Sequence, residues 1–150
     1  VPESVKEQLK WLFCMENGID GFSLSDCDMT VAREFISYVL EFAILWGVPI
    51  SEEALKRTDD IGRYLYFCLE NRVCAICGRR ADVHHVDRVG LGRNRFTIIH
   101  TGMEAEALCR EHHGECHTIG QATFDEKYHI YGIKLDEWLC EKLGLNTQAE

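Results

Sequence analysis

The side chains that could carry out chemistry lie close together in the sequence, between Cys74 and His117. Six of the seven histidines and four of the eight cysteines of this 150-residue chain fall within that stretch. They are Cys74, Cys77, His84, His85, His100, Cys109, His112, His113, Cys116 and His117. Thiolate and imidazole groups are ligands of zinc and related metals, and packing alone gives no reason to gather them. The sequence therefore predicts metal binding.

Two pairs of these residues have the spacing of a zinc knuckle. Cys74 and Cys77 are separated by two residues, and Cys109 and His112 repeat that spacing. Together they offer a Cys3His set, which closes a tetrahedral site without an open position and is typical of structural zinc. A redox-active cysteine pair is the alternative, but no thioredoxin-like βαβ pattern surrounds Cys74. We predict a structural Zn²⁺ site.

The remaining histidines suggest a second site of the opposite design. His113 and His117 are four residues apart, so on a helix both imidazoles face the same side. His84 and His85 are consecutive on an expected strand and therefore point to opposite faces. One of these two can therefore join His113 and His117 around a divalent ion with open positions, while its neighbour stands near the ion as an unmetallated base that deprotonates water. The alternative is that these four histidines share no role.

The surrounding sequence predicts an α+β protein with helices on both sides of the metal-binding stretch. We expect an acidic α-helical unit over residues 1–71, with helices over 2–16, 26–46, 52–57 and 61–72. The metal-binding module would span residues 72–134, and a C-terminal helix and tail would span 135–150. Within the module, residues 81–89 and 96–100 are typical of strands, and residues 103–120 are helical in character. Thr123 and Glu126 have the spacing of a capping box.

Charge is distributed unevenly along the chain. The formal net charge is −9, but residues 72–134 contain nine Lys/Arg against eight Asp/Glu. The acidic load therefore belongs to the flanking helices, and the module is neutral to slightly basic before any metal is counted. No apolar run approaches the roughly 18 residues of a membrane span. The cysteines outside the module, at positions 14, 27, 68 and 140, are best explained as buried free thiols.

A glycine- and arginine-rich loop follows the first expected strand. Arg88, Arg93 and Arg95 flank the glycines of GLGRNR, and such a loop could hold DNA phosphates; an ordinary solvated hairpin tip is the alternative. No helix has the features of a base-reading element. We therefore expect selectivity for DNA structure rather than for DNA sequence.

The motifs CAICG, ADVHHVDRVGLGRNR, ALCREHH and HTIG…FDEKYHIYGI together resemble the HNH (ββα-metal) endonuclease superfamily. Within this superfamily, the motifs look like those of the HNH nucleases encoded by bacteriophages of Gram-positive hosts, over most of residues 22–134. The resemblance implies a β-hairpin followed by a helix around one catalytic metal. It also implies hydrolysis of DNA phosphodiester bonds, in phage replication, recombination or DNA processing in the cytoplasm of the host bacterium.

The resemblance also implies roles for single residues. His85 matches the general base, His84 the first metal ligand, and His113 and His117 the ligands on the helix. The identity of the catalytic ion, Mg²⁺, Mn²⁺, Zn²⁺ or Ni²⁺, stays open. The chain departs from the family where an asparagine often orients the base: Glu104 occupies that position. His100 is the better candidate for the orienting role or for an additional ligand.

Two classes of function follow from these observations. The first is a metal-dependent HNH endonuclease. The second is a non-catalytic, zinc-stabilised protein that binds DNA or a recombination partner on an HNH scaffold, with a replication or recombination protein docked on the acidic helices. Retention of all four catalytic-type histidines favours the enzyme, because structural zinc needs none of them. A zinc metalloprotease is excluded by the absence of an HExxH motif.

Overall fold

The computed structural model describes residues 4–51, 53–54, 61–86 and 97–147. Its N-terminal part consists of two helices, α1 (Val5–Asn17) and α2 (Met29–Leu45). α1 begins where the Ser4 hydroxyl accepts a hydrogen bond from the backbone N–H of Glu7, and it ends at Gly18 with φ 62°. That left-handed conformation favours glycine, so the predicted stop of the first helix at Gly18 is confirmed.

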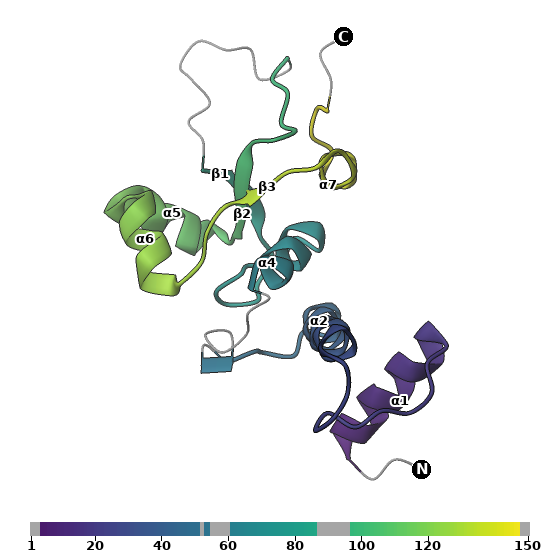
Figure 1. The fold of residues 1–150 in the computed structure, drawn as a ribbon. Helices are drawn as coiled ribbons and strands as arrows, with labels where there is room; N and C mark the ends of the chain where they lie inside the picture. Colours follow the sequence, from purple (N-terminus) through teal and green to yellow (C-terminus); the bar gives the residue numbers. More distant parts are fainter. Residues whose placement is uncertain (1–3, 52, 55–60, 87–96, 148–150) are drawn as a thin grey trace.

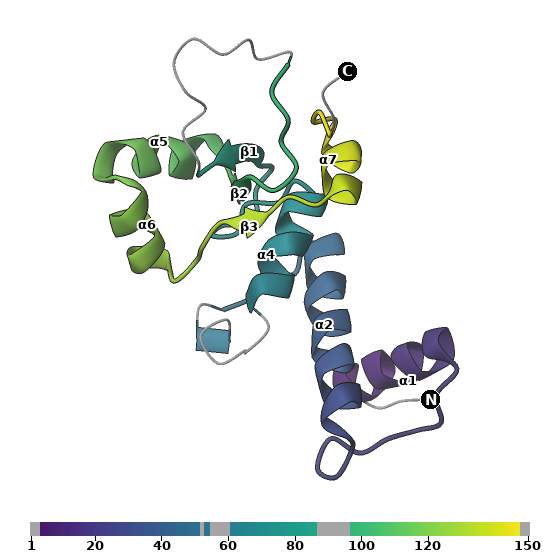
Figure 2. The ribbon, with the colours of Figure 1, turned by 45° about the horizontal axis from the view of Figure 1, so that its top comes forward.

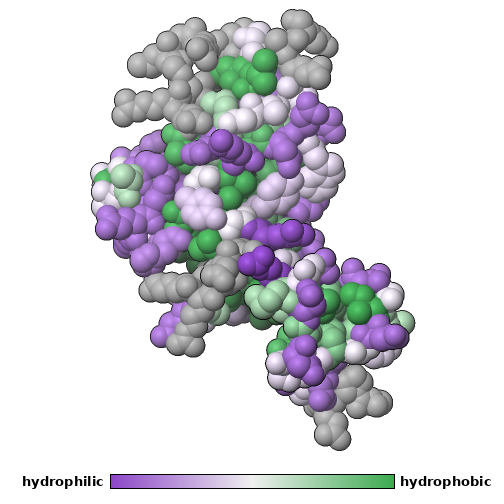
Figure 3. Space-filling view, viewed as in Figure 1, coloured by the Kyte–Doolittle hydropathy of each residue, from purple (hydrophilic) through white to green (hydrophobic). Residues whose placement is uncertain are grey.

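The two helices are held together by an aromatic cluster. The ring of Phe13 packs edge-on against Phe22, Phe35 and Tyr38, with centroids 5.5 to 5.8 Å apart. Figure 2 shows α1 at the end of α2 that lies away from the sheet, and Figure 1 also shows α1 on the side of the molecule away from the sheet. Figure 3 shows hydrophobic residues exposed among hydrophilic ones on this lobe. Trp11 and Met15 of α1 are also exposed. Helix α1 is thus remote from the metal-binding stretch.

Helix α4 (Ile61–Glu70) connects the N-terminal helices to the rest of the molecule. Half of its residues are buried: Tyr64, Leu65, Phe67, Cys68 and Leu69. It packs against α2 on one side and against the sheet and α7 on the other. The hydrophobic core therefore runs without interruption from Leu40 and Ile44 of α2 through α4 to the C-terminal helix. The predicted divisions at residues 71/72 and 134/135 stay predictions.

A small antiparallel sheet forms the centre of the module. Its strands are β1 (Asp82–His85), β2 (Glu104–Leu108) and β3 (Ile133–Lys134), in the order β1-β2-β3. His84 pairs with Glu106 and His85 with Ala105. Just before β3, a Cβ atom on Gly132 would come within 2.9 Å of both Glu104 and Val86. Glycine is therefore needed where the chain passes this close to the hairpin.

The second strand of the hairpin differs from the sequence prediction. Residues 103–120 were expected to be helical, but Glu104–Leu108 pair with β1 as a strand. Residues 97–100, part of the predicted strand 96–100, lie outside any strand. EAEAL consists of residues that favour helices, and tertiary pairing overrides that local preference because the buried strand gains its hydrogen bonds from β1. The ββα arrangement itself is confirmed.

Three helices complete the structure: α5 (Arg110–Ile119), α6 (Gln121–Tyr128) and α7 (Glu137–Leu143). α5 and α6 pack against each other beside the hairpin (Figure 2). The predicted capping box at Thr123 is wrong, because α6 already begins at Gln121 after Gly120. α7 ends at Gly144 as predicted. The fold class is α+β, and no helix in the described ranges has the length and apolarity needed to cross a bilayer.

Candidate metal centres and catalytic histidines

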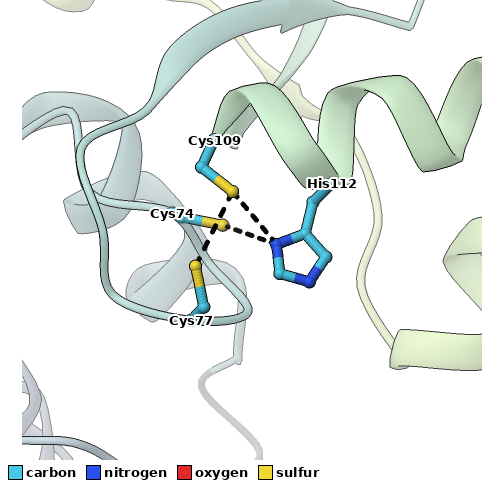
Figure 4. A group of neighbouring side chains, drawn as sticks. All are labelled: Cys74, Cys77, Cys109 and His112. Carbon is cyan, nitrogen blue, oxygen red and sulfur yellow. Dashed lines mark hydrogen bonds between the residues drawn. The ribbon is translucent and has the colours of Figure 1, made fainter.

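The four predicted zinc ligands converge in the structure. Cys74 and Cys77 lie on a tight turn in which the backbone N–H of Gly78 donates to the carbonyl of Cys74 at 3.0 Å. Cys109 and His112 lie at the start of α5 and face this turn (Figure 4). The potential ligand atoms of all four residues lie within 4.8 Å of one another.

The distances within this Cys3His cluster fit a zinc ion. The sulfur atoms of Cys77 and Cys109 are 3.7 Å apart, and Nδ1 of His112 lies 3.6 Å from the sulfur of Cys74 and 3.2 Å from that of Cys109. Tetrahedral zinc with Zn–S bonds of ~2.3 Å places its sulfur ligands roughly 3.8 Å apart. The cluster could therefore hold a zinc ion, with Nδ1 as the ligand atom of His112.

The surroundings of the cluster favour a bound cation. Burial raises the pKa of the Cys74 thiol to about 11, so a cation is needed to hold this residue as a thiolate. Burial also acts to raise the pKa of Cys77, but hydrogen bonds with Arg79, Cys74 and Cys109 together outweigh it and the net pKa is lowered. Nε of Arg79 lies 3.3 Å from the Cys77 sulfur, and the same guanidinium pairs with Glu111 on α5. Arg79 thus links the two halves of the site.

His84, His113 and His117 form a second group of potential ligands. The imidazole centroids of His84 and His113 are 4.6 Å apart, and those of His84 and His117 are 5.4 Å apart. The Nε2 atoms of His113 and His117 approach to 3.0 Å, the separation of neighbouring nitrogen ligands at about 90° around an ion bound at ~2.1 Å. This donor set of three imidazoles fits a divalent ion and leaves coordination positions for other ligands.

The electrostatics of this group also suit metal binding. Burial, and then the neighbouring His84 and His117, lower the pKa of His113. A lowered pKa keeps the imidazole neutral near pH 7, and only the neutral form can bind a metal. Exposure differs among the three, since His84 is buried and His117 is exposed. One side of the group is therefore inside the protein and the other faces solvent.

His85 and His100 form a separate pair. Nε2 of His85 lies 2.8 Å from Nδ1 of His100. His100 comes from the segment between β1 and β2, and its backbone N–H donates to the carbonyl of Asn146 after α7. The structure thus brings together the predicted base and the residue predicted to orient it. Glu104 begins β2, where its carbonyl accepts from the backbone N–H of Val86.

Several side chains that lie next to the second group were not predicted from the sequence to have a functional role. Gln121 lies with its Oε1 atom 2.9 Å from Nε2 of His84, and it also contacts Glu106, Cys116 and Asp125. Cys116 was counted among the clustered residues, but without a role. The sequence offered no signal for these contacts, because a glutamate at position 106 is ordinary in the helix expected over residues 103–120. The positions of these side chains depend on the pairing of β1 with β2 and on the contact between α5 and α6.

The predicted DNA-binding arginines Arg88, Arg93 and Arg95 lie outside the described residues.

One comparison with known proteins gives a match. A family model described as "Putative HNHc nuclease" matches residues 1–146, nearly the whole chain. No curated protein and no solved structure matches. The matched range includes both histidine groups, the Cys3His cluster and the N-terminal helices.

Proposed function

Because the chain belongs to the HNHc nuclease family, we propose that it is a metal-dependent endonuclease that hydrolyses phosphodiester bonds of DNA. The single observation that carries this proposal is the juxtaposition at the end of β1. His84 faces His113 and His117 there, and the next residue, His85, faces His100. An ion site and a candidate base thus occupy consecutive positions of one strand.

Each group has a distinct chemical task. His84, His113 and His117 would hold a divalent ion, which supplies Lewis acidity to the scissile phosphate and to the leaving oxygen. His85 would take the proton from the attacking water, because it is not among the ligands. This division needs no nucleophilic side chain.

His100 would orient His85. Burial lowers the pKa of His100, so its imidazole is neutral near pH 7 and can accept a hydrogen bond through Nδ1. If Nε2–H of His85 donates to it, the proton-accepting lone pair of His85 is on Nδ1. His100 would thereby perform the task that the family often gives to an asparagine, at the position where this chain has Glu104.

The biological setting extends the same proposal. The substrate would be recognised by structure, with Arg88, Arg93 and Arg95 contacting phosphates. On the resemblance of the sequence motifs alone, we extend the proposal to a role in phage replication, recombination or DNA processing, in the host cytoplasm. The acidic N-terminal helices are the surface on which a replication or recombination protein would dock.

One observation favours the second candidate, a zinc-stabilised protein that binds DNA or a partner without cleaving it. Glu104 places a carboxylate at the position where an orienting asparagine is common. The Cys3His cluster can stabilise the fold without any contribution from His84, His85, His113 or His117. In the endonuclease His85 is needed for catalysis, whereas in the binding protein it would contribute only to packing.

Cleavage assays with the His85→Ala variant distinguish the two candidates. We expect purified protein to nick supercoiled or branched DNA with Mg²⁺, Mn²⁺ or Ni²⁺. Loss of the base should reduce the rate by about 10²–10⁴-fold. His129→Ala is the matched control, because His129 is an exposed histidine after α6 and outside both groups. No cleavage with any of the three ions, or equal cleavage by His85→Ala, would contradict the proposed activity.

A further inference from the structure

A buried polar network lies behind the three-histidine group. At its centre is Gln121, the first residue of α6. Its side chain contacts His84 on β1, Glu106 on β2 and Asp125 on α6. Glu106 is only 3% exposed and lies opposite His84 in the sheet. Three elements distant in the sequence thus meet at one amide group.

The orientation of the Gln121 amide follows from its partners. Its Nε2 atom has two hydrogens and faces two carboxyl oxygens, Oε2 of Glu106 at 3.0 Å and Oδ1 of Asp125 at 2.8 Å. Its Oε1 atom faces the Cys116 thiol at 3.4 Å and Nε2 of His84 at 2.9 Å. The opposite orientation would place the amide oxygen against two carboxyl oxygens and leave both N–H groups without those acceptors.

The amide orientation determines which nitrogen of His84 carries the hydrogen. Oε1 of Gln121 can only accept, so Nε2 of His84 must donate to it. In a neutral imidazole the lone pair is then on Nδ1. His84 is 5% exposed, so bulk water does not compete for this hydrogen bond.

We propose that Gln121 is a positioning residue of the metal centre: it fixes His84 in the Nε2–H tautomer, which presents Nδ1 to the ion. Glu106 and Asp125 act one step further away, because they hold the amide of Gln121 in place. This proposal rests on the metal site of the proposed function. Hydrogen-bonded neighbours of this kind set the tautomer and orientation of metal-bound histidines.

The first test reads the tautomer directly in the 150-residue protein with zinc in the Cys3His cluster and no second ion. Long-range ¹H–¹⁵N correlation spectra distinguish protonated from unprotonated imidazole nitrogens. We expect a protonated Nε2 and an unprotonated Nδ1 for His84, assigned by comparison with His84→Asn. The reverse pattern would overturn the proposal. This measurement needs no variant of Gln121, so it decides even if such a variant fails to fold.

The second test measures Ni²⁺ binding by calorimetry. Gln121→Met keeps the length of the side chain but removes the acceptor, and we expect affinity to fall by about 10–100-fold, with both His84 tautomers populated. Glu126→Met is the control, because Glu126 is exposed on the same helix. Unchanged affinity in Gln121→Met would overturn the proposal.

The outcomes separate this inference from the proposed function. Wild type that binds Ni²⁺ with the expected tautomer but cleaves no DNA contradicts the nuclease and leaves the role of Gln121 intact. Cleavage by wild type together with the Nδ1–H tautomer contradicts only the role of Gln121. Failure of wild type to bind Ni²⁺ at these histidines would overturn both.

Discussion

The two histidine-containing clusters of the module share helix α5 but have opposite designs. The Cys3His cluster has four donors on a tight turn and the start of α5, and so fills a tetrahedron. The other cluster has three imidazoles, from one buried residue on β1 and two residues of the helix. His112 and His113 are adjacent in the sequence, yet each belongs to a different cluster.

This difference teaches how one short helix can serve stability and chemistry together. Successive residues of a helix point about 100° apart, so His112 faces the cysteine turn while His113 faces β1. The closed cluster ties α5 to the turn before β1, and the open cluster lies on the other side of the same helix. Binding in the first would thereby fix the geometry of the second.

The largest expected effect comes from opening the closed cluster. Cys77→Ser removes one of four donors, so we expect zinc content at this site to fall toward zero. The free energy of unfolding should fall on the order of 4 kcal/mol, because zinc binding contributes directly to folding. Metal analysis and denaturant unfolding measure both quantities. Cys27→Ser is the control, since Cys27 lies outside both clusters; equal zinc content in the two variants would contradict the Cys3His assignment.

Adjacent substitutions on α5 test whether the two clusters are separate. We expect His113→Ala to weaken Ni²⁺ binding at the open cluster by at least about 100-fold and to leave zinc at the closed cluster. His112→Ala should lower zinc content and thermal stability first, because it removes a ligand of the closed cluster. Zinc analysis and calorimetry on both variants check this. Identical losses in the two variants would show that the clusters act as one site.

The smallest expected effect concerns pH and the buried carboxyl behind the open cluster. Burial, and then a hydrogen bond with Asp125, raise the pKa of Glu106 from 4.5 to about 8. Between these values the folded state keeps a proton that the unfolded state has lost, so stability falls as pH rises. Glu106→Gln removes this dependence and still offers Gln121 an acceptor. Relative to wild type, the variant should gain about 2 kcal/mol more at pH 8 than at pH 6.

Denaturant unfolding of the zinc-loaded proteins at both pH values measures this gain. Zinc binding makes the free energy of unfolding of both proteins depend on pH. This shared dependence cancels when the value for wild type is subtracted from the value for the variant. A gain that is the same at pH 6 and pH 8 would show that the Glu106 carboxyl titrates near its ordinary value in the fold.

The sequence by itself predicted the two clusters of potential ligands and determined much of the helical frame. A spacing of two residues within each pair defined the Cys3His cluster, because a tight turn or a helix start presents both side chains to one ion. A spacing of four defined His113 and His117, because one helical turn aligns them. Gly18 and Gly144 marked helix ends correctly, since the left-handed conformation there favours glycine.

Only the tertiary structure decided which segment pairs with β1 and what lies behind the metal ligands. The segment Glu104–Leu108 favours a helix locally. It pairs with β1 nevertheless, because buried backbone groups must form hydrogen bonds. That pairing places Glu106 opposite His84, and the packing of α6 on α5 brings Gln121 to the same point. Contacts between residues 15 and 37 positions apart leave no periodic trace in a sequence. The spacing could therefore predict Cys74, Cys77, Cys109, His112, His113 and His117 as potential ligands, whereas it could not predict the side chains that lie behind them.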